Sequence, residues 1–161
     1  METQANVLAL VQKSSHKLQT EVERLTERLS LRLDGELPVL QLRGPSDEYA
    51  QAVYTLWDAD GVITLRAKWQ LETGEPIKPT AIPAVLRFSL SFDANDDVEH
   101  IQRRIQEYFG REAELHWNIS QSGDVGHLEL SLHFIYHTDQ DMLFAYIRYV
   151  LGIITGRVMA A

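Results

Sequence analysis

The sequence predicts an α+β domain, in which one twisted antiparallel sheet carries helices packed on one of its faces. Several stretches alternate apolar and polar residues one by one, which is the pattern of strands with one buried and one wet face. Three other stretches, at the beginning, in the middle and at the end, repeat their apolar residues at helical spacing. The expected order is α-β-β-β-α-β-β-α, with one extra short strand.

Residues 2–33 are expected to form a long first helix, which Asp34 and Gly35 end. Its apolar residues follow a spacing of three and four, and Ser15 takes the one seam position that lacks an apolar side chain. Such a seam packs either on the chain's own sheet, as in most amphipathic helices, or along a partner. The seam residues are Leu8, Val11, Leu18, Val22, Leu25 and Leu29.

The next part of the chain predicts strands. Residues 38–43 are expected to form the extra short strand, at an edge of the sheet. A hairpin follows, in which an arm over residues 49–57 turns at residues 58–61, because Asp-Gly is a strong turn signal. In the second arm, residues 63–69, strict alternation places Trp69 on the apolar face.

The second half of the chain begins with a predicted loop. Residues 71–84 hold three prolines and one glycine, which favours irregular structure. Alternation over residues 86–92 predicts another strand, and residues 96–109 predict a helix that Gly110 ends. Two strands joined at residues 122–124 then complete the sheet. Their expected inward-facing residues are Leu115, Trp117, Ile119, Leu128, Leu130, Leu132, Phe134 and Tyr136.

The last helix is apolar almost all round. Between Met142 and Ile154 only two tyrosines and Arg148 carry polar side-chain atoms. This run is shorter than the roughly 20 apolar residues that cross a membrane, so a membrane span is not expected. A helix that is apolar all round must be buried all round, and a second copy of the chain is expected to cover the side that the sheet leaves open. The predicted C2 homodimer interface consists of Tyr146, Tyr149, Val150, Gly152, Ile153 and Gly156.

The bulk composition limits the class of protein. The length of 161 residues suits one domain spanning 1–161, and 45% hydrophobic with 24% charged residues is typical of globular proteins. The absence of cysteine excludes disulfides and cysteine catalysis and indicates the cytoplasm. The first 15 residues lack the pattern of a signal peptide. A net charge of −8 disfavours nucleic acid and suits a basic protein partner.

No catalytic, cofactor or metal motif stands in the sequence, so an enzyme is not expected and no cofactor is assigned. One alternative is a metal- or ligand-sensing domain that uses late histidines near Glu129, although a solvated strand face also explains them. These histidines are His116, His127, His133 and His137.

A second alternative is a nucleic-acid-associated factor, acting directly or through a binding partner. Arg66, Lys68, Arg87 and His133 are expected to share the wet face of the sheet as a modest basic patch. RNA binding would also need exposed aromatic rings on that face, and Trp69 falls on the other one. Direct nucleic-acid binding is therefore not expected.

The order of elements resembles that of type III secretion chaperone-like proteins, which the bacterial YbjN-like proteins share. The resemblance is carried by patterns such as GVITLRAKW, VLRFSLSF and DVEHIQRRIQEYFG, and it covers residues 2–160. It implies a non-enzymatic, dimeric, chaperone-like or regulatory adaptor that holds a segment of a partner protein. We expect the partner either to add a strand at residues 38–43 or to dock in a groove between the first helix and the sheet. The residues that would border this groove are Leu18, Val22, Leu25 and Leu29.

Overall fold

The computed structural model describes residues 4–33, 40–44, 48–58, 61–71, 81–93, 98–138 and 140–155. Within them the chain folds into helices and one antiparallel sheet, which confirms the predicted α+β class. The helices are α1 (Gln4–Arg28), α2 (Val98–Phe109) and α3 (Met142–Thr155). The strands are β1 (Arg32–Leu33), β2 (Gln41–Arg43), β3 (Tyr49–Asp58), β4 (Gly61–Gln70), β5 (Ala81–Asp93), β6 (Ala113–Ser122) and β7 (Val125–His137).

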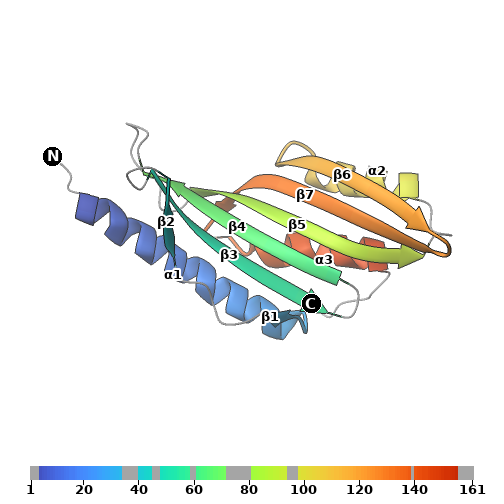
Figure 1. The fold of residues 1–161 in the computed structure, drawn as a ribbon, viewed down its shortest axis with the longest axis horizontal. Helices are drawn as coiled ribbons and strands as arrows, with labels where there is room; N and C mark the ends of the chain where they lie inside the picture. The colour runs from blue at the N-terminus through green and yellow to red at the C-terminus, as the bar shows by residue number, and fades with distance from the viewer. Residues whose placement is uncertain are drawn as a thin grey trace.

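The seven-stranded sheet has the order β1-β3-β4-β5-β7-β6, and β2 lies beside β3 off this path (Figure 1). Both predicted hairpins are present, since Asp58 pairs with Gly61 and Ser122 pairs with Val125. Because β7 lies between β5 and β6, the strands before α2 and the strands after it form one continuous sheet.

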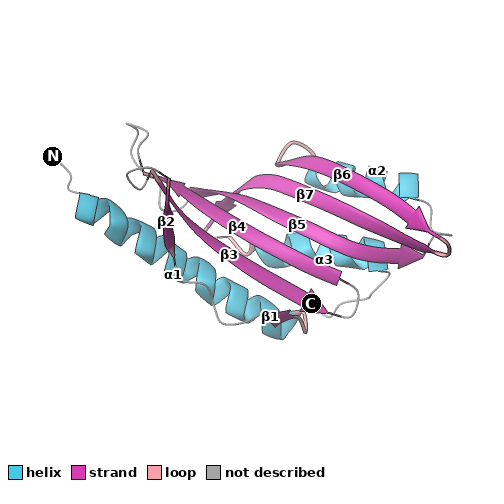
Figure 2. Cartoon of the chain, viewed as in Figure 1, coloured by secondary structure: helices cyan, strands magenta, loops and turns pink. Residues whose placement is uncertain are grey.

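Alternation along the strands decides which face is buried. Every second residue of β5 is buried, with Leu86, Phe88 and Leu90 fully so, and the residues between them face outward. The helices cover this buried face, with α3 in contact with both α1 and α2. Figure 2 shows the strands in front of α2 and α3, with α1 running beside β3. The opposite face of the sheet, which we call the open face, carries none of the three helices.

The first helix ends five residues before the predicted position. Ser30 adopts φ 54°, and the Leu31 amide donates to the Thr26 carbonyl oxygen at 3.1 Å. These are the features of a left-handed helix cap in which a buried residue follows the cap. The chain then turns back as β1, where Arg32 pairs with Trp57. The predicted extra strand is present as β2, whereas β1 was not expected.

The predicted loop over residues 71–84 is wrong at its end, because β5 begins at Ala81. Residues 72–80 lie outside the described part. Pro83 pairs with Ile135 of β7, while the register between β4 and β5 begins at Ala84. At Pro83 the strand β5 is paired with β7 alone. Proline, which has no N–H to donate, is tolerated at such a position.

The second helix begins at Val98, and the residues expected to precede it lie outside the described part. It ends as predicted, since Gly110 has φ 55° and its amide donates to the Gln106 carbonyl oxygen at 2.9 Å. Ile105 and Phe109 are the side chains that α2 buries, and the Phe109 ring meets the Tyr146 ring of α3 edge to face.

Candidate functional site

The four residues predicted to border a partner groove lie in the core of the chain's own fold. Leu18, Val22, Leu25 and Leu29 are each at most 3% exposed. The space between α1 and the sheet is therefore filled by the chain's own side chains. This is the outcome in which the helical seam packs on its own sheet, and it leaves no open groove beside these four residues.

Three of the predicted interface residues on α3 make contacts within the chain. Tyr146 is 6% exposed and Val150 is fully buried. The ring of Tyr149 stacks on Tyr108 of α2, with centroids 3.8 Å apart, and its hydroxyl donates to the Arg104 carbonyl oxygen at 3.2 Å. These side chains are in contact with other parts of the same chain, so a second copy is not needed to cover them.

The remaining predicted interface residues lie further along α3. Gly152 and Ile153 are half-buried, and Gly156 lies outside the described residues. The α3 helix therefore keeps only a partly exposed outer side, because it lies between α1 and α2 in one layer. Dimerisation itself stays a prediction, but a surface other than α3 is needed to explain it.

The open face carries the predicted basic patch. Arg66 of β4 pairs with Val85 of β5, which in turn pairs with His133 of β7. Lys68 and Arg87 lie two residues away along their strands, so alternation places them on the same face. The prediction that these four basic side chains share the face is confirmed.

The two tryptophans of the first hairpin face opposite ways. Trp69 is 2% exposed on the helix side, and its Nε1 donates to Ser14 Oγ of α1 at 3.1 Å. Trp57 is 37% exposed on the open face opposite Val62, with the Arg32 guanidinium 5.2 Å from its ring centroid. The prediction for Trp69 is confirmed, and Trp57 offers an exposed aromatic surface on the open face.

The late histidines do not form a cluster of metal ligands. His116 lies opposite Ser131, and Glu129 pairs with Asn118, two residues further along each strand. The rings of His116 and His133 meet edge to face, with centroids 5.0 Å apart. Within the described ranges, no three His, Cys, Asp or Glu side chains are placed to hold a metal ion together.

The open face is hollowed at the end where β5 begins. A groove of about 620 Å³ lies there between β4, β5, β7 and the turn from α2 to β6. Basic side chains at its rim include Arg66, Lys68 and Arg111, while Val85 and Ile135 contribute to its apolar floor. Ile135 is 45% exposed, so this floor is open to a ligand.

The strand β6 forms an edge of the sheet, since β7 is its neighbour and no strand follows it in the sheet order of the described residues. Its ten residues, AELHWNISQS, contain no proline, lysine or arginine. Leu115, Trp117 and Ile119 are half-buried on the helix side, at the margin of the core. Its one carboxylate is Glu114, and long edges with little charge and no proline readily pair with another strand.

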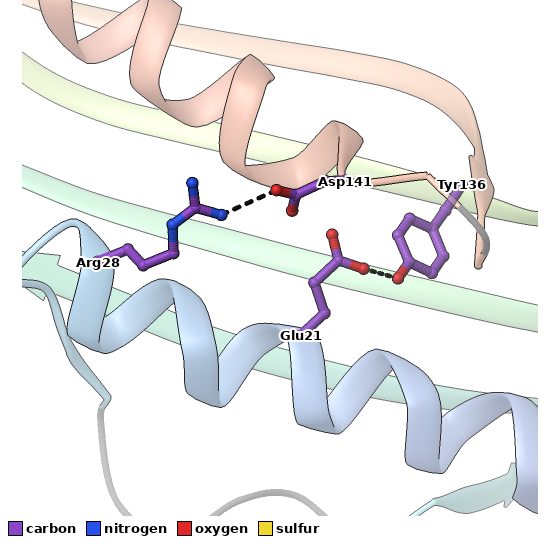
Figure 3. A network of polar contacts seen from close by, with 4 residues as sticks. All are labelled: Glu21, Arg28, Tyr136 and Asp141. Carbon is purple, nitrogen blue, oxygen red and sulfur yellow. Dashed lines mark hydrogen bonds and ion pairs between the residues drawn. The ribbon is translucent and has the colours of Figure 1, made fainter. Parts of the chain in front are cut away.

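A buried acid connects α1 to the end of β7. Glu21 is 9% exposed, and its Oε2 accepts a hydrogen bond from the Tyr136 hydroxyl. Its second oxygen has no hydrogen-bond partner among the described residues. Figure 3 shows that Asp141, just before α3, lies close to Glu21 and pairs with Arg28 at 2.8 Å.

Burial raises the pKa of Glu21 from its usual 4.5 to about 7, and the negative charge of Asp141 adds to the increase. The charge of Arg24 and the backbone N–H of Leu143 act in the opposite direction. A polar cavity of about 370 Å³ adjoins this cluster between α1 and the start of α3. The arrangement can bind and release one proton near neutral pH at the junction of α1 with α3.

The sequence contains a signal for this cluster that the predictions missed. Ser14, Glu21 and Arg28 follow one another at intervals of seven, beside the apolar positions Leu18 and Leu25. Residues seven apart on a helix lie on the same side of it. The three polar side chains therefore form one line along α1, and they bond to Trp69, Tyr136 and Asp141 in turn.

The chain matches no protein-family model, no curated protein and no solved structure. The resemblance to the YbjN-like and type III secretion chaperone-like proteins therefore stays an expectation. Among the helices of the described part, none is both long enough and apolar enough to cross a membrane.

Proposed function

We propose that this chain is a non-enzymatic protein-binding module that works as a cytoplasmic homodimer, in the manner of a chaperone-like adaptor. The observation that carries the proposal is the asymmetry of the sheet. Its helices occupy one face, while the open face presents apolar side chains among charged ones. Trp57, Val62 and Ile135 are each at least 37% exposed there, and removing such surface from water favours association by about 25 cal/mol per Å².

The location in the cytoplasm is supported by the composition. A chain of 161 residues without a cysteine suits a reducing compartment, since it neither forms nor needs disulfides.

A homodimer is best supported at the edge strand β6. If two copies pair antiparallel about Trp117, then Leu115 lies opposite Ile119 of the second copy, and the two Trp117 side chains meet. On the other side of the strands, His116 lies opposite Asn118, and Glu114 lies opposite Ser120. Apolar side chains would meet apolar ones, and no like charges would face each other. We therefore place the dimer interface at β6 in preference to α3.

The oligomeric state is tested by light scattering behind size exclusion on the wild type, Trp117→Lys and Ile153→Lys. The wild type should have a mass near twice 18.4 kDa. A charge at Trp117 should give a monomer, because it opposes itself across the proposed interface, whereas a charge at Ile153 on α3 should leave the dimer intact. The reverse result would place the interface on α3, and a monomeric wild type would contradict the dimer altogether.

Partner binding is tested by a photo-reactive phenylalanine analogue placed at Val62 on the open face, with Glu27 on the exposed side of α1 as the control position. Illumination in cells should attach one specific protein at Val62 and not at Glu27. The purified partner should then bind the wild type and bind Val62→Lys more weakly. A folded protein that cross-links to nothing at Val62, Thr64 or Val85 would contradict the proposal.

A further inference from the structure

The groove on the open face combines two kinds of surface. Its floor includes Pro83, Val85 and Ile135, and its rim carries Arg66 and Arg111 on opposite sides together with Lys68. Arg66 comes from β4 and Arg111 from the turn after α2, and β5 and β7 run between them. Basic groups from distant parts of the chain thus converge over an apolar surface.

The acidic residues of the groove leave these basic groups unpaired. Glu112 Oε2 accepts a hydrogen bond from the Tyr146 hydroxyl at 3.3 Å, so this carboxylate is engaged on the helix side. Glu114 Oε1 lies 3.3 Å from His116 Nε2. Among the described residues, neither Arg66 nor Arg111 has an ion-pair partner.

This local positive charge stands in a chain whose net charge is −8. An exposed guanidinium binds carboxylates well, because its planar N–H groups can donate two parallel hydrogen bonds to the two oxygens. The floor, in contrast, is mainly aliphatic, with the His133 ring beside Val85. A ligand that fits both must carry a carboxylate and an aliphatic group within a few ångströms of each other.

We propose that the groove binds a short acidic segment of the partner protein, with aspartate or glutamate side chains on Arg66 and Arg111 and an aliphatic side chain on Ile135. The assignment rests on the proposed function, because it names the chemistry of the partner. A nucleic acid fits less well, since the aliphatic side chains of Pro83, Val85 and Ile135 offer its bases little to stack on beyond the His133 ring.

The test uses two fluorescein-labelled, capped pentapeptides, Asp-Ile-Asp-Ile-Asp and Ile-Asp-Ile-Asp-Ile, with Asn replacing Asp in matched controls. Binding to the full-length chain is measured by fluorescence anisotropy at low and at physiological salt. At least one acidic peptide should bind, at least about tenfold more tightly than its Asn counterpart, and salt should weaken it. Equal binding of the acidic and Asn peptides would overturn the proposal.

Variants locate the binding. Arg66→Gln and Arg111→Gln should each weaken the acidic peptide by about tenfold, as loss of a charged hydrogen bond does. Arg103→Gln removes the same charge from the exposed side of α2 and should leave binding unchanged. Ile135→Asn should weaken the peptide as well, and a melting curve of each variant shows that it is folded. Unchanged binding in Arg66→Gln and Arg111→Gln, or tighter binding of an oligothymidylate than of either peptide, would overturn the assignment.

The result is separable from the test of the proposed function. Val62, the cross-linking position, lies four residues from Arg66 along β4 and outside the groove. A partner captured at Val62 together with peptides that fail to bind would reject the acidic segment alone. Absence of a cross-linked partner at Val62, Thr64 and Val85 alike would reject the proposed function itself.

Discussion

Glu21 and Tyr136 stand 115 residues apart in the sequence, yet the Tyr136 hydroxyl donates a hydrogen bond to the Glu21 carboxyl group inside the fold (Figure 3). Glu21 also lies beside Asp141 at the start of α3, which pairs with Arg28 of α1. The contact between α1 and the C-terminal part of the chain therefore combines an apolar seam with an acid whose pKa is raised to about 7.

The stability of the protein should depend on the protonation of Glu21. Its pKa is about 7 in the folded state, against about 4.5 when exposed. Between these values the folded state holds a proton that the unfolded state has lost, so the contribution of Glu21 to the free energy of unfolding falls as pH rises from about 4.5 to about 7. The full change is about 3 kcal/mol. Urea denaturation at a series of pH values measures it.

The variant Glu21→Gln isolates this effect, because the amide oxygen still accepts a hydrogen bond from Tyr136 and carries no titrating proton. It should match the wild type near pH 5 and exceed it in stability near pH 8. Glu27→Gln, on the exposed side of α1, should follow the wild type at every pH. Parallel curves for the wild type and Glu21→Gln would show that Glu21 does not titrate in this range.

Ser14 should contribute to stability through its bond to Trp69. In Ser14→Ala the Trp69 Nε1–H would stay buried without its acceptor, which costs about 1 to 3 kcal/mol. Lys13→Ala, one residue away and exposed, should change the free energy of unfolding little. A double-mutant cycle with Trp69→Phe should show coupling, since the second change removes the unpaired donor. Additive effects would mean that the hydrogen bond contributes nothing.

Leu25 distinguishes a core position from a partner site. It is 1% exposed, so Leu25→Asp should bury an unpaired charge and lower the free energy of unfolding by more than about 3 kcal/mol. Gln12→Asp makes the same change of charge on the exposed side of α1 and should melt like the wild type. If Leu25→Asp melted normally and lost only its partner, the groove predicted between α1 and the sheet would be right after all.

Alternation made the strands predictable, because a period of two survives wherever one face is buried and the other is wet. The end of α1 was missed because Ser30 takes the left-handed conformation that glycine usually supplies. Leu29, Leu31 and Leu33 do alternate there, and this change from helical spacing was the available signal. Pro83 caused the start of β5 to be predicted as loop. A proline within a strand is tolerated only where the strand is paired on one side, and this is the case at Pro83.

The candidate sites were harder to predict than the fold, because they depend on contacts between distant residues. The apolar sequence of α3 predicted that its side chains are buried on all sides, and this is correct for Val150. It did not predict what covers the helix, because the positions of α1 and α2 beside it are a property of the tertiary structure. The spacing of Ser14, Glu21 and Arg28 was visible in the sequence, but Tyr136 and Asp141 as their neighbours were not.

Two glycines should differ in how their substitution can be rescued. A methyl group at Gly61 would overlap the backbone oxygen of Ser89, whereas one at Gly126 would overlap the ring of Phe92. Both Gly61→Ala and Gly126→Ala should therefore destabilise the sheet by about 1 to 3 kcal/mol, as overpacking does. Adding Phe92→Leu should recover part of the loss in Gly126→Ala, because the obstructing atoms belong to the ring. Phe92→Leu should add to the loss of stability in Gly61→Ala, because the atom that obstructs the methyl group there belongs to the backbone. Urea denaturation of the two glycine variants, each with and without Phe92→Leu, measures these changes. Rescue of both glycine variants, or of neither, would contradict this packing around Phe92.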